Sequence, residues 1–312
     1  MKKSLAALIA IVCLPVIAFN SYAAQEWTLT QDNVNLNLKG VSPYVEKLSS
    51  GADRLYFASE SALPDPIMVM DCNEANCTRK SITSRFGSDA TIVTLNNGTR
   101  KVFFVEMGPS GKSIKFATLG ADGLSHGAVS ALDVDGSTVS QNEGAWGVPD
   151  AVVLPDGKVR VYWVFKDPAT GKPGLPEAVI SATSTDASAT SFKRDPGFRL
   201  TGGYVDTEVL RAIDGDWVMI VSTGPGAGTQ KLYMATSVDG LTWKVNENVI
   251  SSPTESALDP TGYEIEKNTW RIYYASAAPG MVVERIYTLK RATLKLSEVQ
   301  ATPTPTPTPT PT

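Results

Sequence analysis

The chain has 312 residues, enough to bury a sizeable core. Its 28 Lys and Arg residues face 32 Asp and Glu, a formal net charge of −4, and no block of like charge stands out. A nucleic-acid binder that follows phosphates is therefore not expected. One histidine, His126, makes a His-rich metal site or a Ser-His-Asp triad hard to build, and three cysteines exclude a four-Cys zinc site. Any chemistry should rest on carboxylates.

Residues 1–23 are predicted to be a signal peptide. Lys2 and Lys3 form its positive start, residues 5–18 its apolar stretch, and Ser21-Tyr22-Ala23 a small-x-small cleavage site. The apolar stretch is too short to span a bilayer, so no transmembrane segment is expected here. The segment predicts a secreted or periplasmic protein.

Two cysteines remain once Cys13 leaves with this peptide. Cys72 and Cys77 have the spacing C-x4-C in a chain bound for an oxidising compartment, and we interpret them as a disulfide that closes a tight turn. A metal-binding pair is the alternative, but it lacks a neighbouring His or Cys ligand.

Between these segments and the tail, one sequence unit occurs five times. Each unit is an apolar run, a turn marked by Asp-Gly, Asn-Gly or a polar substitute, and a second, aromatic-rich run, which predicts a β-hairpin. The equivalent starts are taken as Ser42, Asp89, Asp150, Asp206 and Asp259, which lie 47 to 61 residues apart. Repetition at this period is typical of propellers and other repeat architectures.

A third strand usually follows the hairpin, at 114–118, 178–183, 231–236 and 285–289, and a fourth strand closes the unit. Four strands in roughly 50 residues make one propeller blade. We therefore predict an all-β fold, a five-bladed β-propeller of four-stranded antiparallel blades, over residues 24–300. Four or six blades remain alternatives, because the first unit is degenerate.

The last segment, residues 301–312, is a low-complexity tail or linker. Thr and Pro alternate from Thr302 onward, which predicts extended polyproline-like chain. Three interpretations stay open: a spacer before a second module, a stalk at a cell surface that carries O-linked sugars, and a plain disordered tail.

The repeated aspartates are the first functional candidates. Inner-strand starts converge around a propeller's channel, so Asp89, Asp150, Asp206 and Asp259 should ring one funnel, with Glu208 two residues beyond Asp206 on the same face. Clustered carboxylates separate in pKa, so that one donates a proton while another stays ionised, as glycoside hydrolysis requires. The alternative is structural, because an Asp that begins every inner strand can bind backbone N–H groups. We prefer that alternative for Asp206 and Asp259.

Several segments carry a resemblance to a known family. The strand that Glu208 opens and the loop Gly224-Pro-Gly-Ala-Gly-Thr229 resemble the acid-blade strand and the Gly-Gly-Thr turn of the five-bladed glycoside hydrolases of the arabinanase, β-xylosidase and invertase superfamily. This resemblance implies Asp89 as the catalytic base, Asp150 as the aspartate that tunes pKa and orients substrate, and Glu208 as the acid. The first unit departs from the family, because Ser42-Pro43 stands where the base usually lies.

Further candidates surround these carboxylates. Glu143 is a second candidate acid just before the third unit. Trp146, Tyr204 and Tyr263 flank inner-strand starts and could stack on sugar rings beside Asp206 and Asp259, with core packing as the alternative. The sequence indicates no cofactor. Calcium would suit an acidic funnel, but no EF-hand-like spacing supports it.

One outer turn resembles a second family. Residues 237–243, Ser-Val-Asp-Gly-Leu-Thr-Trp, resemble the Asp-box hairpins of sialidases, and their expected role is to cap a tight turn. A sialidase would also need three converging arginines. The chain has Arg54, Arg199, Arg211 and Arg271, but no spacing marks a triad.

The leading hypothesis is a secreted glycoside hydrolase that acts on a poly- or oligosaccharide through a carboxylate acid/base pair in the central funnel. The alternative from another class is a non-catalytic propeller that binds a glycan or a protein and is carried on the Thr-Pro stalk. A sialidase is the weaker third hypothesis.

Overall fold

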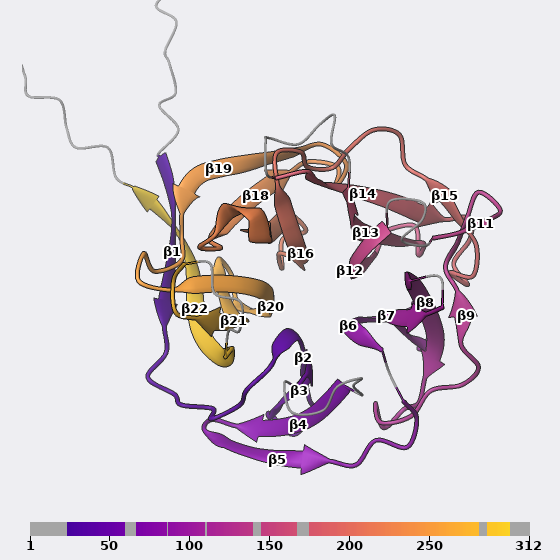
Figure 1. Ribbon diagram of the computed structural model, residues 1–312, viewed down its shortest axis with the longest axis horizontal. Helices are drawn as coiled ribbons and strands as arrows, with labels where there is room; N and C mark the ends of the chain where they lie inside the picture. The colour runs from indigo at the N-terminus through magenta and orange to yellow at the C-terminus, as the bar shows by residue number, and fades with distance from the viewer. Residues whose placement is uncertain are drawn as a thin grey trace, which may run out of the picture. The chain divides into compact units, whose positions relative to one another are not determined.

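The computed structural model describes residues 24–59, 67–85, 87–109, 111–139, 145–166, 175–280 and 286–299, without the side chains of 24, 25, 145, 146, 298 and 299. The predicted signal peptide and the Thr-Pro tail lie outside these residues. Residues 27–296 form one compact unit of five β-sheets arranged around a centre (Figure 1). The predicted five-bladed propeller is confirmed.

Each blade is built from consecutive strands. The first holds β2 (Val41–Lys47), β3 (Asp53–Ala58), β4 (Ile67–Asn73) and β5 (Asn76–Lys80). The second holds β6 (Ser88–Thr94), β7 (Arg100–Gly108), β8 (Gly111–Leu119) and β9 (Ser130–Ala131). The third holds β12 (Ala145–Val153), β13 (Val159–Lys166), β14 (Glu177–Ser184) and β15 (Phe192–Arg194). The fourth holds β16 (Tyr204–Arg211), β17 (Trp217–Thr223), β18 (Leu232–Ser237) and β19 (Trp243–Val249). A 3-10 turn, η2 (Pro225–Ala227), follows β17.

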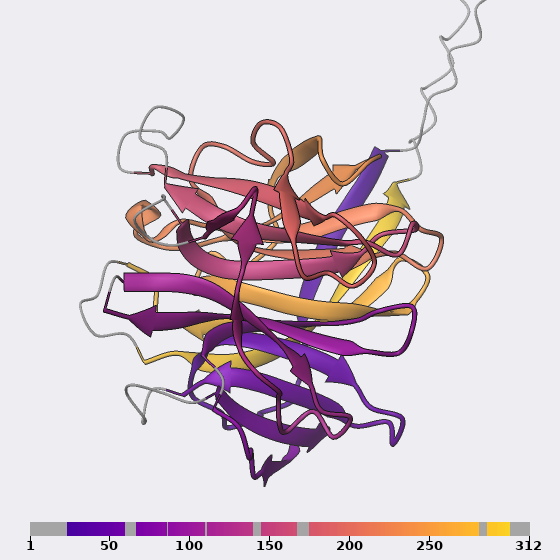
Figure 2. The ribbon, with the colours of Figure 1, turned by 90° about the vertical axis from the view of Figure 1, so that its right-hand side faces the viewer.

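Two features refine the predicted blade. Two short strands, β10 (Asp133–Val134) and β11 (Ser137–Thr138), extend the third sheet, and β10 pairs in parallel with β15. Strands β8, β14 and β18 confirm three of the four predicted third strands. The strands run across the unit and are joined by turns at both ends (Figure 2).

The fifth blade closes differently from the prediction. It holds β20 (Ser256–Glu266), β21 (Thr269–Ala277), β22 (Thr288–Val299) and, as its outermost strand, β1 (Ala24–Gln31) from the other end of the chain (Figures 1 and 2). The third strand therefore begins at Thr288 rather than at residue 285. Trp27 of β1 packs on Trp270, with ring centroids 5.4 Å apart. Sharing one blade between both ends closes the ring of sheets.

The core lies between the blades. Five clusters of buried side chains each join two neighbouring sheets, and together they form a closed circuit. Representative pairs, one for each interface in order, are Tyr56 and Phe104, Phe103 and Trp163, Tyr162 and Met219, Ile220 and Trp270, and Leu55 and Tyr273. Because aromatic and aliphatic burial at every interface stabilises the fold, the inner strands are held in a fixed arrangement around the centre.

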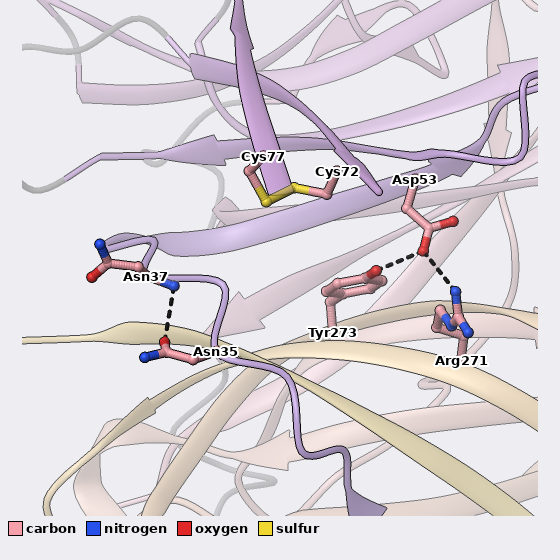
Figure 3. The surroundings of a disulfide bond; sticks show 7 residues. All are labelled: Asn35, Asn37, Asp53, Cys72, Cys77, Arg271 and Tyr273. Atoms are coloured by element: carbon pink, nitrogen blue, oxygen red, sulfur yellow. Dashed lines mark hydrogen bonds and ion pairs between the residues drawn. A yellow bond between two sulfur atoms is a disulfide. The ribbon is translucent and has the colours of Figure 1, made fainter. Parts of the chain in front are cut away.

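A disulfide and a buried carboxylate support the first blade. Cys72 and Cys77 face each other across the β4–β5 hairpin and are bonded, with 4.0 Å between their Cα atoms (Figure 3), which confirms the predicted disulfide. Nearby, Asp53 accepts hydrogen bonds from the Tyr273 hydroxyl at 2.6 Å and from Arg271 at 3.1 Å. This carboxylate thereby links the first and fifth blades.

In the described part of the chain, no helix has the length and apolar character that a membrane crossing requires.

Candidate functional site

Each of the five inner strands contains a β-bulge at the same place, and β12 and β20 each have a second register shift. In β16, for example, Val205 pairs with Ser222 and Glu208 with Ile220, so that three steps on β16 oppose two on β17. In each bulge, two residues of the inner strand face one residue of the neighbouring strand. The first of these two has a positive φ between 48° and 52°, and the five such residues are Ser42, Asp89, Val148, Asp206 and Asp259. A bulge bends its strand and aims the extra side chain out of the regular alternation.

This geometry corrects the predicted alignment of the third unit. The residue equivalent to Asp89 and Asp206 is Val148, and Asp150 lies two positions further on. A sequence signal for the true register exists, because proline follows the bulge residue in Ser42-Pro43, Val148-Pro149 and Asp259-Pro260. The prediction aligned aspartate with aspartate and so placed the third unit two residues too late.

Two sets of side chains follow from the bulges. The bulge ring is Ser42, Asp89, Val148, Asp206 and Asp259. The latch ring consists of the residues two positions later, Tyr44, Thr91, Asp150, Glu208 and Thr261. Of the predicted ring of aspartates, Asp89, Asp206 and Asp259 belong to the bulge ring, whereas Asp150 and Glu208 belong to the latch ring.

Members of the bulge ring bind one another. The Ser42 hydroxyl donates to Asp89 Oδ1 at 2.6 Å, and the Ser42 amide donates to Asp259 Oδ2 at 2.9 Å. The Asp259 amide points to Asp206 Oδ2 at 3.5 Å, and that oxygen also accepts the Ser222 hydroxyl at 2.5 Å. Three carboxylates from three blades are thus held together by a chain of donors.

Members of the latch ring bind the next blade instead. Asp150 Oδ2 accepts the Val209 amide at 2.7 Å, and Glu208 Oε1 accepts the Thr261 hydroxyl at 3.0 Å and the Gly262 amide at 3.3 Å. The same pattern recurs elsewhere: Thr261 accepts the Val45 amide, and the Tyr44 hydroxyl donates to the Ile92 carbonyl. These bonds join successive inner strands, so Asp150 and Glu208 have a structural task.

Burial and mutual repulsion raise the pKa of four of these carboxyls. Burial raises the pKa of Asp150 to about 7 and that of Asp206 to about 6. The pKa values of Glu208 and Asp259 lie well above their ordinary values, first because of burial and then because of the charges of Asp150 and Asp206 respectively. The centre therefore retains protons near neutral pH.

Two cavities border these residues. The narrow cavity, about 30 Å³, is about the volume one water molecule occupies, and Ser42, Asp89, Asp206, Glu208 and Asp259 are among its lining residues. The wide cavity, about 290 Å³, shares Asp206, Asp259 and Val148 with the narrow one. Its volume is close to the lower end of ligand pockets, roughly 300–1,000 Å³. The bulge ring thus separates a water-sized space from a ligand-sized one.

The remaining predicted residues lie apart from both cavities or outside the described residues. Tyr204 packs edge-on against Tyr233, with ring centroids 5.7 Å apart, and Tyr263 donates its hydroxyl to Asp53 at 2.5 Å. Both arrangements favour the packing alternative over sugar stacking. Asp150 lines neither cavity. Glu143 and the side chain of Trp146 lie outside the described residues.

Sequence reasoning missed Glu177. It is the first residue of β14, is 3% exposed, and lines the wide cavity with an Oε2 atom that has no hydrogen-bond partner. The one available signal was an acidic residue directly before the fully apolar run 178–180. A buried carboxylate without a partner is costly, so Glu177 requires an explanation.

The four arginines considered for a sialidase lie elsewhere. Arg54 pairs with Asp71, Arg271 with Asp53, Arg211 stacks on the Trp217 ring at 4.1 Å, and Arg199 bonds to Pro196. None of them is among the described residues that line either cavity.

The Asp-box-like turn has the expected local role. Asp239 Oδ1 accepts the amides of Leu241 and Thr242, both at 2.8 Å, and the Trp243 indole donates to the Gly240 carbonyl at 3.0 Å. The aspartate thus caps the turn between β18 and β19, the two strands of that blade that lie furthest from its inner strand β16.

Across the described residues, no group of three or more His, Cys, Asp or Glu side chains is arranged to hold a metal ion.

Comparison with known proteins identifies the fold. No family model matches the chain, and no curated protein sequence matches it. Among solved structures, a thermostable family-43 glycoside hydrolase is 15% identical with a TM-score of 0.60, covering 90% of this chain and 98% of its own. An endo-arabinase from Bacteroides thetaiotaomicron is 11% identical with a TM-score of 0.57, covering 84% and 96%. An N-acetylgalactosamine deacetylase from F. plautii, in complex with blood group B trisaccharide, is 11% identical with a TM-score of 0.60, covering 87% and 94%. At these identities the likeness concerns the fold.

Proposed function

We propose that the protein is a glycoside hydrolase that cleaves a poly- or oligosaccharide at the centre of its propeller. The observation that carries this proposal is the meeting of Asp89, Asp206, Glu208 and Asp259 at one water-sized cavity, directly beside a ligand-sized one. Hydrolysis of a glycosidic bond needs a protonated carboxyl, an ionised carboxylate and a water molecule, and this arrangement can supply all three.

In this proposal Glu208 is the general acid, because its raised pKa keeps a proton on the carboxyl near neutral pH. Asp89, held by the Ser42 hydroxyl, is the base that activates water in the narrow cavity. Asp150 tunes the acid, because its negative charge raises the pKa of Glu208. The three roles fall on three successive blades.

The proposed substrate and location rest on independent observations. Solved propellers of similar fold include a family-43 glycoside hydrolase and an endo-arabinase, which makes a glycan the first substrate class to test. The predicted signal peptide and the Cys72–Cys77 disulfide favour a secreted or periplasmic protein.

Replacing Glu208 by Gln tests the proposal. The Gln side-chain oxygen can still accept the Thr261 hydroxyl and the Gly262 amide, so the variant should fold with a stability within about 1 kcal/mol of the parent. Sugar release from a panel of arabinans, xylans, fructans and sialosides should fall by about 10²–10⁴-fold. Glu266→Gln, at the exposed far end of β20, is the matched control and should release sugar at the parent rate. Undiminished release by Glu208→Gln would refute the assignment of the acid.

One observation favours a second function, a non-catalytic glycan-binding propeller. Asp150 and Glu208 accept hydrogen bonds from backbone amides of the next blade, and this structural role explains the presence of both acids without catalysis. Glycan binding with no sugar release, unchanged by Glu208→Gln, would select this alternative.

A further inference from the structure

The wide cavity has an unusual balance of charge. Its described lining includes the carboxyls of Glu177, Asp206 and Asp259, together with valine side chains and Leu258, and it includes no Lys or Arg. Carboxyl groups gathered in a low-dielectric space, with no cation among its described lining residues, make the potential there negative to the extent that they are ionised. Such a space favours a ligand that brings positive charge and repels an anionic one.

Of the three carboxyls that line the wide cavity, Glu177 is the one with an unsatisfied buried oxygen. Asp206 and Asp259 are engaged by donors of the bulge ring, whereas Glu177 Oε2 is buried without a hydrogen bond. Within the described residues, this oxygen therefore lacks the donor that a buried carboxylate needs.

The surrounding backbone is shaped to hold this carboxylate. The Gly203 amide donates to the Glu177 carbonyl at 3.0 Å, which ties β14 to the segment before β16. Gly224 leaves the space that the carboxylate occupies, because a Cβ atom at that position would lie 2.7 Å from Glu177 Oε2. Both neighbours flank strands of the fourth blade, whereas Glu177 belongs to the third, so the position of Glu177 depends on the packing of the two sheets.

We propose that the wide cavity binds one amino-sugar residue and that Glu177 pairs with its ammonium group; this inference rests on the proposed action on glycans. An ammonium offers three donors and a positive charge, which match an unpaired carboxylate oxygen. A volume of about 290 Å³ suits a single sugar ring. The apolar side chains, such as Val164 and Leu258, can face the C–H groups of that ring. Glu177 is then the residue that determines specificity for the charged sugar.

The test uses the mature full chain and measures binding calorimetrically at constant ionic strength near pH 6.5. The probes are glucosamine and galactosamine, their neutral parents glucose and galactose, and the N-acetylated forms, which keep the nitrogen but lose its charge. At least one hexosamine should bind about tenfold more tightly than both its parent and its N-acetyl form, as expected for a charge-assisted hydrogen bond. Glu177→Gln should remove this difference, while Glu266→Gln should retain it.

Two results overturn the inference: equal affinity of the parent protein for hexosamines and neutral sugars, including no binding of either, or an undiminished preference in Glu177→Gln. Thermal unfolding of Glu177→Gln shows that the variant is folded, and its midpoint should not fall, because Gln removes an unpaired buried carboxylate without changing shape.

Sugar release on the polysaccharide panel is measured in parallel and separates the two proposals. Release without an ammonium preference overturns this inference alone. An ammonium preference that depends on Glu177, without release from any glycan, supports this inference and overturns the proposed hydrolase.

Discussion

The bulge ring and the latch ring lie two residues apart on the same five strands, yet their side chains make different contacts. In the bulge ring, Asp206 and Asp259 are bound within the ring and face both cavities. In the latch ring, Asp150 and Glu208 accept amides from the next blade. A carboxylate at an inner-strand start therefore lines a cavity, joins two blades or, like Glu208, does both, and its place relative to the bulge decides which contacts it makes.

The comparison also explains why the centre tolerates so many acids. Each carboxyl accepts at least one hydrogen bond from a neighbouring strand or from the ring itself, which lowers the cost of burial. The remaining cost of burying the charged form raises the pKa values of four carboxyls: Asp150, Asp206, Glu208 and Asp259. Stability should therefore depend on pH in a direction opposite to ordinary acid denaturation.

The largest expected effect concerns Asp206 and pH. Its folded pKa of about 6 exceeds the unfolded value of about 3.9, so between these values the unfolded chain has lost a proton that the folded chain keeps. The stability that Asp206 contributes is complete below about pH 4 and is lost as pH rises to about 6, by about 3 kcal/mol. Urea unfolding from pH 4.5 to 7.5 should show a markedly smaller decline for Asp206→Asn than for the parent.

Asp156→Asn is the control for this experiment. Asp156 is exposed in a hairpin turn of the third blade, and its pKa is lowered, chiefly by the Lys158 amide, so its removal should leave the decline above pH 4.5 unchanged. Identical pH profiles for the parent and Asp206→Asn would contradict the stated role of the bulge ring.

The next effect distinguishes the latch ring. Asp150→Ala removes the acceptor of the partly buried Val209 amide and should lower the free energy of unfolding by about 2 kcal/mol. Asp150→Asn keeps an acceptor oxygen and should stay within about 1 kcal/mol of the parent. Chemical denaturation of both variants at pH 7 measures the difference. Equal stabilities of the Ala and Asn variants would show that the bond to the next blade contributes nothing.

The smallest effect concerns Val148, the apolar member of the bulge ring. A β-branched residue at a φ of 52° is strained, whereas Asn adopts this region readily. Val148→Asn should raise the free energy of unfolding by about 1 kcal/mol, after the loss of partly buried apolar surface is subtracted. The thermal midpoint should rise by about 2–4 °C. Val205→Asn, at a buried position just before the fourth bulge, should lower the midpoint.

Much of the architecture was predictable because it is encoded locally. Turns marked by Asp-Gly or Asn-Gly between aromatic-rich runs determine hairpins at each repeat, and their period indicates blades. The Cys72–Cys77 disulfide follows from short spacing in a chain whose sequence predicts export. Three of the four third strands and the convergence of Asp89, Asp206 and Asp259 on one cavity were predicted in the same way.

Three features required the tertiary structure. The outermost strand of the fifth blade comes from residues 24–31, more than 250 residues away in sequence from its partner β22, and no local pattern records that pairing. The register of Asp150 depends on a one-residue bulge, which shifts every later contact of the strand without changing its composition.

Glu177 depends on the tertiary structure most completely. The sequence by itself determined repeated hairpins, a short-range disulfide and a carboxylate-rich centre, because each arises from residues close together in the chain. The wide cavity exists only where strands of four blades, among them β2, β14, β16 and β20, come together. Whether an acid at the start of a strand is exposed, paired or buried without a partner is decided by that packing, since burial and charge are properties of the assembled surroundings.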